Sequence, residues 1–359
     1  MSFQNQQLHP QFKLNGLDFN MSSELMEFSI NLEKEGSPHE VHIAQFIQQW
    51  FDKKDTISVQ TSGSTGEPQQ IEMSKKAMIR SAEATGVFFK LAPSTSALLC
   101  LPPQYIAGKM MLVRAMTLGW NLHVVTPEKD ALTQYDNEYD FVAMVPYQVY
   151  HSIHALRKVK KLIIGGGAVS RDLAARLQNV FTECFATYGM TETITHCAVK
   201  RINGLAKSDE FHAMPDIKFS KDDRGCLVVE APRISEEKII TNDLVLLTSK
   251  TTFEWLGRID NLINSGGIKI NPETVEEKLS PFISIPFFIA SETNEELGEQ
   301  LILVLERKTE NPTSSYSEAF DTLTRYERPK KIYTVSSFTY TETGKVMRKK
   351  TLELISFMQ

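Results

Sequence analysis

The sequence has few cysteines and no pairs of them. Its four cysteines are Cys100, Cys184, Cys197 and Cys226, and none of them forms a C-x-x-C motif. Disulfide frameworks and structural zinc sites both depend on closely and regularly spaced cysteines. The sequence therefore predicts thiols of the core, and neither a disulfide-rich nor a zinc-binding protein.

Long hydrophobic runs and an excess of positive charge are also missing. No run approaches the about 18 apolar residues of a membrane span, and the first residues, MSFQNQQLHPQFKLNG, lack the pattern of a signal peptide. The net charge is −5, whereas nucleic-acid-binding domains are usually basic. We therefore expect a cytoplasmic protein without a membrane span that does not bind nucleic acid; whether it forms a homo-oligomer stays open.

Strand-like and helix-like segments alternate through the first half of the chain. Strand-like runs separated by helix-like segments lie at 97–101, 122–126, 141–145, 162–164 and 181–187. This alternation predicts βαβ units, and therefore an α/β fold with a mainly parallel sheet flanked by helices. Apolar residues at helical spacing predict a further helix at 39–51, whereas residues 1–38 are expected to form an extended arm or short strands.

The composition of the second half indicates a different organisation. A chain of 359 residues is longer than one hydrophobic core usually serves, so we expect two domains. Short β-type runs between 211 and 256 predict a small antiparallel unit. The charged, glycine-containing segment at Asp260 predicts a hinge, so we assign 1–259 to a large N-terminal domain and 260–359 to a small α+β C-terminal domain.

The segment from Gln60 to Met73 reads QTSGSTGEPQQIEM and combines hydroxyl side chains with two glycines. Such a segment lets backbone N–H groups converge on an anion. Strand-like residues precede it and helix-like residues follow it, as in phosphate-binding loops, although the Gly-Lys-Ser/Thr ending of the Walker form is absent. A polar surface turn is the alternative interpretation, because these residue types are common in turns.

Two more polar segments follow predicted strands, where ligands bind in parallel sheets. The run from Gly165 to Ala168 would either expose backbone to a flat ligand or form a tight turn before a helix. Residues 188–192 read YGMTE and offer an aromatic ring for a base, a hydroxyl for a phosphate and a carboxylate for magnesium. Together these groups suit a nucleoside triphosphate.

These motifs resemble, in their order and spacing, those of the adenylate-forming acyl-CoA synthetase superfamily. The resemblance spans residues 60–350 and rests on the glycine-hydroxyl loop, YGMTE, Thr-Asn-Asp at 241–243, Gly-Arg-Ile-Asp at 257–260 with Ser-Gly-Gly, and Thr-Gly-Lys at 343–345. More narrowly, LPPQYIAGKMMLVRAM and YGMTETITHCAVK are similar to segments of the ligases that join o-succinylbenzoate to coenzyme A in menaquinone biosynthesis.

The resemblance implies two half-reactions and their cofactors. A small-molecule carboxylate attacks the α-phosphate of ATP, held with Mg²⁺, to give an acyl-adenylate and pyrophosphate; the thiol of coenzyme A then displaces AMP. Because a carboxylate is already ionised at pH 7, the first step needs positioning and charge neutralisation rather than a general base. The family also implies a rotation of the C-terminal domain between the half-reactions, with Asp260 at the hinge.

The resemblance further implies roles for single residues in the nucleotide site. Adenine would lie between Tyr188 on one side and the backbone of the glycine run on the other, namely Gly166, Gly167 and Ala168. Thr191 would bind the α-phosphate and Glu192 would bind Mg²⁺, while Asp243 and Arg258 would hold the ribose hydroxyls. Lys345 would bridge the substrate carboxylate and the α-phosphate. The β- and γ-phosphates would lie against Thr61, Ser62, Gly63, Ser64, Thr65 and Gly66.

The acyl pocket is expected around the segment from Tyr105 to Arg114, including Gly108 and Lys109, and another wall is expected from Thr193, Thr195 and His196. Arg114 stands where an arginine of the resembled ligases is associated with the aromatic diacid, and a second carboxylate needs such a partner. The alternatives are that Arg114 extends from an amphipathic helix to water and that His196 is a structural histidine.

Three positions depart from the family pattern. Gln69 replaces the lysine after the loop proline, Asn242 replaces the glycine of Thr-Gly-Asp, and Tyr105 replaces a pocket histidine; Lys75 or Lys76 could compensate for Gln69. Three other functions stay open: another aryl- or acyl-CoA ligase, an adenylation enzyme that loads a carrier protein, and, because of Gln69, a non-catalytic nucleotide-binding protein.

Overall fold

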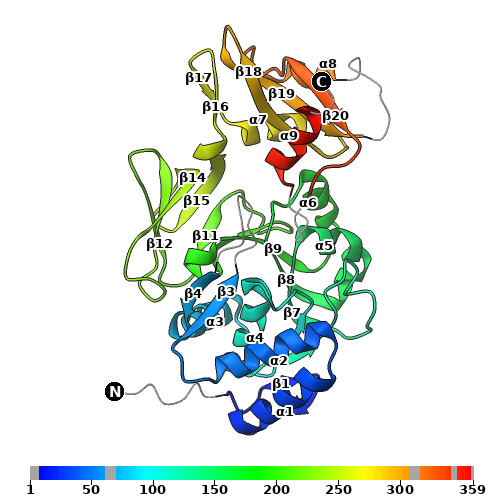
Figure 1. The fold of residues 1–359 in the computed structure, drawn as a ribbon, viewed down its shortest axis with the longest axis vertical. Coiled ribbons are helices and arrows are strands. Elements are labelled where there is room, and N and C mark those ends of the chain that lie inside the picture. Colours follow the sequence, from blue (N-terminus) through cyan, green and yellow to red (C-terminus); the bar gives the residue numbers. More distant parts are fainter. Residues whose placement is uncertain (1–7, 61–69, 308–315, 341–345, 357–359) are drawn as a thin grey trace. The chain divides into compact units, whose positions relative to one another are not determined.

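The computed structural model describes residues 8–60, 70–307, 316–340 and 346–356 (Figure 1). The chain divides into two compact units: Met1–Lys218 with Val229–Ile239, and Phe219–Val228 with Ile240–Gln359. We call these the first and the second unit. The division lies before residue 260, so the second unit includes part of the segment that we assigned to the N-terminal domain. The hinge at Asp260 stays a prediction.

The first unit is built on one large mixed sheet. Its strands neighbour one another in the order β11-β10-β9-β8-β7-β5-β6-β1-β2. The strands β1, β6, β5, β7, β8 and β9 pair in parallel, and β10 pairs with β9 in the antiparallel sense. The predicted α/β class is therefore confirmed. The strand bounds are β1 Lys13–Leu14, β2 Leu17–Asp18, β5 Ser96–Leu99, β6 Asn121–Val124, β7 Tyr139–Met144, β8 Val159–Ile164, β9 Glu183–Gly189, β10 His196–Arg201 and β11 Phe211–Ala213.

Helices cover the faces of this sheet (Figure 1). Both faces are buried, so β7 reads as an apolar run, with Phe141 to Met144 all in the core. Among the helices, α4 is buried on nearly every side, and it carries Lys109 and Arg114 into the interior. The helix bounds are α3 Lys75–Phe89, α4 Ile106–Leu118, α5 Pro146–Ser152, η1 Ile153–Lys158, α6 Arg171–Leu177 and η2 Thr191–Thr193.

The N-terminal segment corrects one expectation. The short strands β1 and β2 are present, but α1 (Ser22–Glu35) is a helix where we expected extended chain. Its Leu25 and Ser29 face the core, and α1 packs along α2 (Pro38–Trp50), the predicted helix. A capping box starts α2, in which the Ser37 N–H donates to Glu40 Oε2 over 2.8 Å.

A strand lies within the segment from Gln60 to Met73, which we expected to lead directly from its loop into a helix. The glycine-hydroxyl loop is followed by β4 (Gln70–Ser74), which pairs antiparallel with β3 (Thr56–Gln60), and α3 begins only at Lys75. Ile71 and Met73 point to one face of β4 and alternate with Glu72, which is the period of a strand. The order is therefore strand, loop, strand, helix.

The second unit contains two groups of strands. The strands β12 (Lys218–Lys221), β13 (Cys226–Glu230), β14 (Ile239–Leu247) and β15 (Thr252–Arg258) are consecutive neighbours, and β14 pairs antiparallel with β15. Two of the short β-type runs predicted between 211 and 256, at 238–240 and 244–248, thus belong to one strand, β14. A five-stranded sheet follows, made of β16 Ile263–Ser265, β17 Ile268–Ile270, β18 Phe287–Asn294, β19 Gly298–Glu306 and β20 Lys331–Val335. Its helices are η3 Ile259–Asn261, α7 Pro272–Leu279, α8 Ser317–Asp321 and α9 Arg348–Ser356.

The cysteines agree with a further expectation. Cys100, Cys184, Cys197 and Cys226 are all buried free thiols. Within the described ranges, no helix has the length and hydrophobicity that crossing a bilayer requires.

Candidate active site

Three of the predicted segments meet at one edge of the sheet in the first unit. The parallel strands β5, β7, β8 and β9 are direct neighbours, so the loops after their carboxyl ends lie side by side. These loops include Pro102 to Gln104, Gly165 to Val169 and Met190 to Thr195. Ligands of open α/β sheets bind at this edge.

The glycine run forms an exposed turn directly after β8. Gly165 donates its N–H to Met144 O over 3.1 Å, and Gly166 has a φ of 76°. A Cβ on Gly165 would lie 2.5 Å from Thr187 Oγ1, so this position has room only for glycine. Gly166, Gly167 and Ala168 are exposed. Their exposed backbone, without bulky side chains, therefore suits the predicted contact with one face of adenine.

Tyr188 lies next to the end of β9, and its ring centroid is 5.9 Å from that of Phe211. The next residue, Gly189, is sterically required, because a Cβ there would lie 2.2 Å from Thr195 O. Tyr188 is half-buried, so part of its ring is open to a ligand. The two sides of the predicted adenine site thus come from adjacent strands, β8 and β9.

The loop after β9 is held by Thr193. This residue is fully buried, accepts the Met190 N–H over 2.9 Å, and places its hydroxyl 2.7 Å from Thr195 O. Its hydroxyl therefore stabilises the loop rather than facing a substrate. The same loop forces Ile194 to a φ of 65°, which is rare for a β-branched residue and is typical of strained functional loops. Nothing in the sequence predicted this strain.

Thr191 and Glu192 follow in this loop, with Thr191 half-buried and Glu192 exposed. Glu192 could hold Mg²⁺, because this ion usually takes one or two protein carboxylates and fills its other positions with water and phosphates. The described residues contain no cluster of three or more acidic, histidine or cysteine side chains that could hold a metal. A single carboxylate fits a magnesium ion that arrives with a nucleotide.

Arg114 is the central side chain of the predicted acyl pocket. It is 1% exposed, so the alternative that it extends to water is wrong. Its guanidinium donates to three neutral groups: Thr85 Oγ1 at 3.3 Å, Thr195 Oγ1 at 3.2 Å and Met111 Sδ at 3.6 Å. None of its hydrogen-bond or ion-pair partners among the described residues is a carboxylate. Burial lowers the pKa of Arg114 to about 9, so the group is still a cation at pH 7.

His196 lies beside Arg114. Its Nδ1 is 3.5 Å from Arg114 Nη2 and 3.3 Å from Thr195 Oγ1. Burial and the neighbouring Arg114 charge hold the pKa of His196 well below its usual value. The imidazole is therefore neutral. Thr85, which accepts from Arg114, was not predicted, because it lies on α3 and has no motif around it.

Lys109 and Arg114 lie on different faces of α4. The Lys109 ammonium is 5.1 Å from the ring centroid of Phe46 on α2, whereas Arg114 faces Thr85 on α3 and the loop after β9. Burial lowers the pKa of Lys109 to about 8. The helix α4 begins after Tyr105, its half-buried N-cap residue. Its first turn packs closely on the preceding loop, because a Cβ on Gly108 would lie 2.4 Å from Pro102 O.

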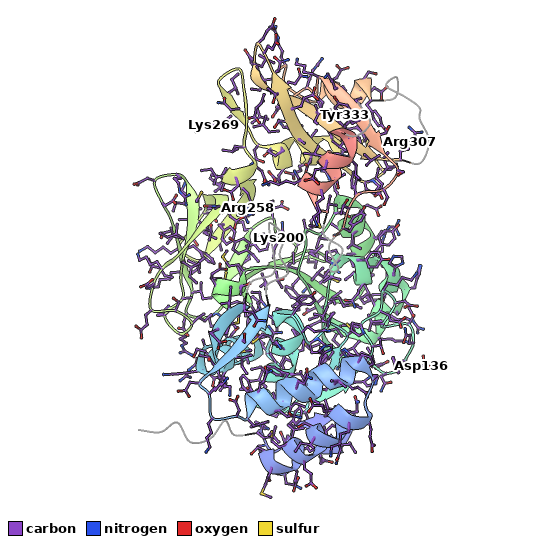
Figure 2. All side chains as sticks on the ribbon, viewed as in Figure 1. Asp136, Lys200, Arg258, Lys269, Arg307 and Tyr333 are labelled. Atoms are coloured by element: carbon purple, nitrogen blue, oxygen red, sulfur yellow. The ribbon has the colours of Figure 1, made fainter. Side chains whose placement is uncertain are left out.

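The second unit brings together the predicted ribose and hinge residues. Asp243 and Arg258 are direct cross-strand partners of β14 and β15, and Asp243 Oδ1 accepts the Trp255 indole N–H over 3.0 Å. Arg258, labelled in Figure 2, also donates to Asp260 Oδ2 over 2.8 Å. The hydrogen bonds that Arg258 and Asn242 donate to Asp260 hold the pKa of this carboxyl group below its usual value.

Some predicted residues lie outside the described part of the chain. They are Thr61, Ser62, Gly63, Ser64, Thr65, Gly66, Gln69 and Lys345. Of the two lysines that could compensate for Gln69, Lys75 is 2% exposed and its Nζ lies 2.7 Å from Asp52 Oδ1. Lys75 is therefore buried and paired with Asp52, so its charge does not replace the lysine that is missing at Gln69.

Comparison with known proteins decides the family. The profile of the AMP-binding enzyme family matches residues 14–218, which is more than half of the chain. The chain belongs to this family. A crystal structure of an AMP-forming acyl-CoA synthetase/AMP-acid ligase II-like protein from Dyadobacter fermentans DSM 18053 is 33% identical, with a TM-score of 0.61, and the match covers 92% of this chain and 98% of that one.

Relatives with named reactions are more distant members of the family. The 2-succinylbenzoate–CoA ligase of Escherichia coli (strain K12) is 25% identical, and the match covers 75% of this chain but only 62% of that enzyme. The chain thus spans less than two thirds of the length of this relative. O-succinylbenzoate coenzyme A synthetase from Bacillus subtilis, solved with ATP and magnesium ion, is 18% identical with a TM-score of 0.70, covering 82% of this chain and 69% of that one; it shows likeness of fold.

Proposed function

We propose that the protein is an ATP-dependent acid–thiol ligase. It activates a carboxylate as an acyl-adenylate with release of pyrophosphate and then transfers the acyl group to coenzyme A. Membership of the AMP-binding enzyme family supports this reaction, as do the relatives named as CoA ligases. The exposed glycine turn, the half-buried Tyr188 and the exposed Glu192 at one sheet edge supply parts that ATP and Mg²⁺ need.

The residues have separate tasks in this proposal. The backbone at 166–168 and the Tyr188 ring bind adenine, Thr191 orients the α-phosphate, and Asp243 with Arg258 binds the ribose. Glu192 would hold Mg²⁺, and the bound ion would supply positive charge beside the phosphates. Lys345 neutralises the charge that develops as the carboxylate attacks, and the loop from Thr61 to Gly66 holds the leaving pyrophosphate.

The observation that carries the substrate class is the buried, uncompensated charge of Arg114. A buried ion is costly unless a group of opposite charge pairs with it. Only neutral groups bond Arg114 among the described residues. A substrate with a second carboxylate supplies the missing charge, so we propose a dicarboxylic acid, and specifically o-succinylbenzoate, which would place the enzyme in menaquinone biosynthesis.

Carboxylate-dependent pyrophosphate release over a panel of acids tests this function. The panel holds o-succinylbenzoate, benzoate and fatty acids of several lengths, each with and without coenzyme A. We expect o-succinylbenzoate to be the best substrate and Lys345→Ala to lose adenylate formation. If benzoate or fatty acids are activated and o-succinylbenzoate is not, the proposal of a dicarboxylic acid substrate is refuted. If the adenylate forms but the acyl group is not transferred to coenzyme A, the acceptor is a carrier protein.

Arg114→Met tests the substrate class separately. Without the guanidinium, kcat/KM for the diacid should fall roughly a hundredfold, since a charged hydrogen bond is lost. Arg176→Met is the matched control, because Arg176 lies on the surface of α6 and pairs with Asp172 over 2.9 Å. Equal effects of the two variants would remove Arg114 from the acyl pocket.

A further inference from the structure

The ring of His196 is fixed in one orientation. Arg114 and Thr195 both lie within hydrogen-bond distance of Nδ1, at 3.5 and 3.3 Å. Phe89 of α3 packs against the ring edge to face, with 6.3 Å between the centroids and 71° between the planes. His196 itself is 6% exposed. The imidazole is therefore held by side chains of α3, α4 and the loop before β10.

These contacts also fix the tautomer. A guanidinium donates hydrogen bonds and accepts none, so Nδ1 must be the accepting nitrogen of a neutral imidazole. The hydroxyl of Thr195 accepts from Arg114 over 3.2 Å, which leaves its own hydrogen free to point at Nδ1. The single ring hydrogen consequently resides on Nε2.

This Nε2–H is a buried donor for which the described residues offer no acceptor. Buried donors are normally satisfied, and one that is not indicates a missing partner. A cavity of about 20 Å³ borders His196, between Ser81 and Ala84 of α3 and the segment from Met214 to Ile217. That volume is enough for one oxygen-sized group, since a water needs about 10–15 Å³.

We propose that His196 is a specificity-determining residue that donates its Nε2–H to a carbonyl oxygen of the acyl substrate. The inference rests on the proposed function, in which Arg114 binds the second carboxylate of the same molecule. Arg114 supplies charge, whereas the neutral imidazole supplies a donor suited to an uncharged oxygen. The substrate class is therefore a dicarboxylic acid with a ketone in its chain, and 2-succinylbenzoate, which gives the relatives their name, contains such a ketone.

A pair of acids that differ by one oxygen tests the proposal. The first is 2-succinylbenzoate and the second is 2-(3-carboxypropyl)benzoate, which keeps both carboxylates and the chain length but has a methylene in place of the ketone. We expect kcat/KM for pyrophosphate release to be at least about tenfold higher for the ketone, because the second acid leaves the donor unsatisfied. This comparison uses the unchanged enzyme, so it does not depend on the folding of a variant.

Two substitutions then assign the preference to His196. In His196→Asn the amide oxygen can replace Nδ1 as the acceptor for Arg114, but no donor reaches the Nε2 position, so the ratio of the two kcat/KM values should fall to about one. His196→Gln places an amide N–H near the Nε2 position and should retain part of the preference. A side chain that only supports the fold would lower both rates and leave their ratio unchanged.

The outcomes separate the two proposals. If neither diacid is activated, the proposed function fails and takes this inference with it. If the unchanged enzyme uses both diacids equally well, the dicarboxylate ligase stands and the role of His196 is overturned, with a buried water as the partner of Nε2. A ketone preference that survives in His196→Asn also overturns it.

Discussion

Asn242 donates to both carboxylate oxygens of Asp260, with its Nδ2 at 3.1 Å from Oδ1 and 3.2 Å from Oδ2. Arg224 holds the other end of the same amide, donating to Asn242 Oδ1 over 3.0 Å. A glycine, which the resembled family has at this position, could not make these contacts. One departure from the family pattern and the predicted hinge residue thus belong to a single hydrogen-bond network.

Asp260→Pro should impair thioester formation more than adenylate formation. Proline fixes φ and would restrict the backbone rotation that we assign to this position. Pyrophosphate release and coenzyme A ester are measured separately. Asp260→Ala is the control, because it removes the contacts with Asn242 and Arg258 but leaves the backbone free. Equal losses of both half-reactions in the proline variant would refute the hinge.

Glu276 should make the second unit less stable as the pH rises from 4.5 to 7. Burial outweighs its contact with Arg348, at 2.9 Å, and raises the pKa of Glu276 from 4.5 to about 7. A raised folded-state pKa gives stability that is fully present below pH 4.5 and is lost as the pH rises through 7. The shift corresponds to about 3 kcal/mol. Urea unfolding at several pH values measures this change in the unfolding free energy.

The matched variants for this test lie next to each other on α7. Glu276→Gln cannot ionise, so its unfolding free energy should change less between pH 4.5 and 7 than that of the unchanged protein. Glu277→Gln makes the same change on the exposed face of the helix and keeps Glu276, so the loss of stability that Glu276 causes between pH 4.5 and 7 should remain. Identical pH profiles for all three proteins would contradict the raised pKa.

Lys109→Met should stabilise the first unit near neutral pH. Burial lowers the pKa of Lys109 from 10.5 to about 8. The folded protein is therefore most stable above pH 10.5, and this stability is lost as the pH falls through 8. The loss in unfolding free energy is about 3 kcal/mol. The ammonium recovers roughly 1 kcal/mol from the Phe46 ring, 5.1 Å away. We expect Lys109→Met to raise the unfolding free energy by about 1–2 kcal/mol at pH 7 and by less at pH 10. Denaturant unfolding measures both values. A lower unfolding free energy at pH 7 would show that the ammonium has a stabilising anion partner.

Gly108→Ala should destabilise the start of α4 by about 1–3 kcal/mol. The new Cβ would lie 2.4 Å from Pro102 O and 2.8 Å from Pro103 Cα, and both neighbours are backbone atoms that cannot turn away. Gly167→Ala is the control, because the nearest atom there is the Pro146 ring at 3.8 Å. Thermal denaturation of the two variants should give a lower midpoint for Gly108→Ala only.

Much of the sheet could be predicted because its signals are local. The strands β5 and β7 are buried along most of their length on both faces, and therefore each reads as a short apolar run wherever it occurs in the chain. The helix α1 was missed because its stability comes from packing on α2, and its buried face is marked by only Leu25 and Ser29. The strand β4 was missed because its pairing with β3 crosses the intervening loop.

In the candidate site, too, the residues of local motifs could be predicted, whereas features that depend on long-range contacts could not. Tyr188, Thr191 and Glu192 could be found because the residues of a strand-end loop are consecutive. The charge of Arg114 could be found too, but its lack of a carboxylate partner depends on Thr85 and Thr195, which lie 29 and 81 residues away. The tautomer of His196 follows from the same long-range contacts, and the strained φ of Ile194 follows from the tight loop that Thr193 closes.

The burial of the cysteines makes the proposed transfer of the acyl group to coenzyme A easy to follow in solution. Burial raises the pKa of Cys100 and of Cys184 to about 12, and all four thiols are enclosed in the fold. The thiolate is the nucleophile that attacks thiol reagents, and a buried cysteine with a raised pKa offers them little accessible thiolate, so the folded protein should react with them very slowly. A colorimetric thiol reagent added to a working reaction would therefore report the coenzyme that remains, with little background from the protein.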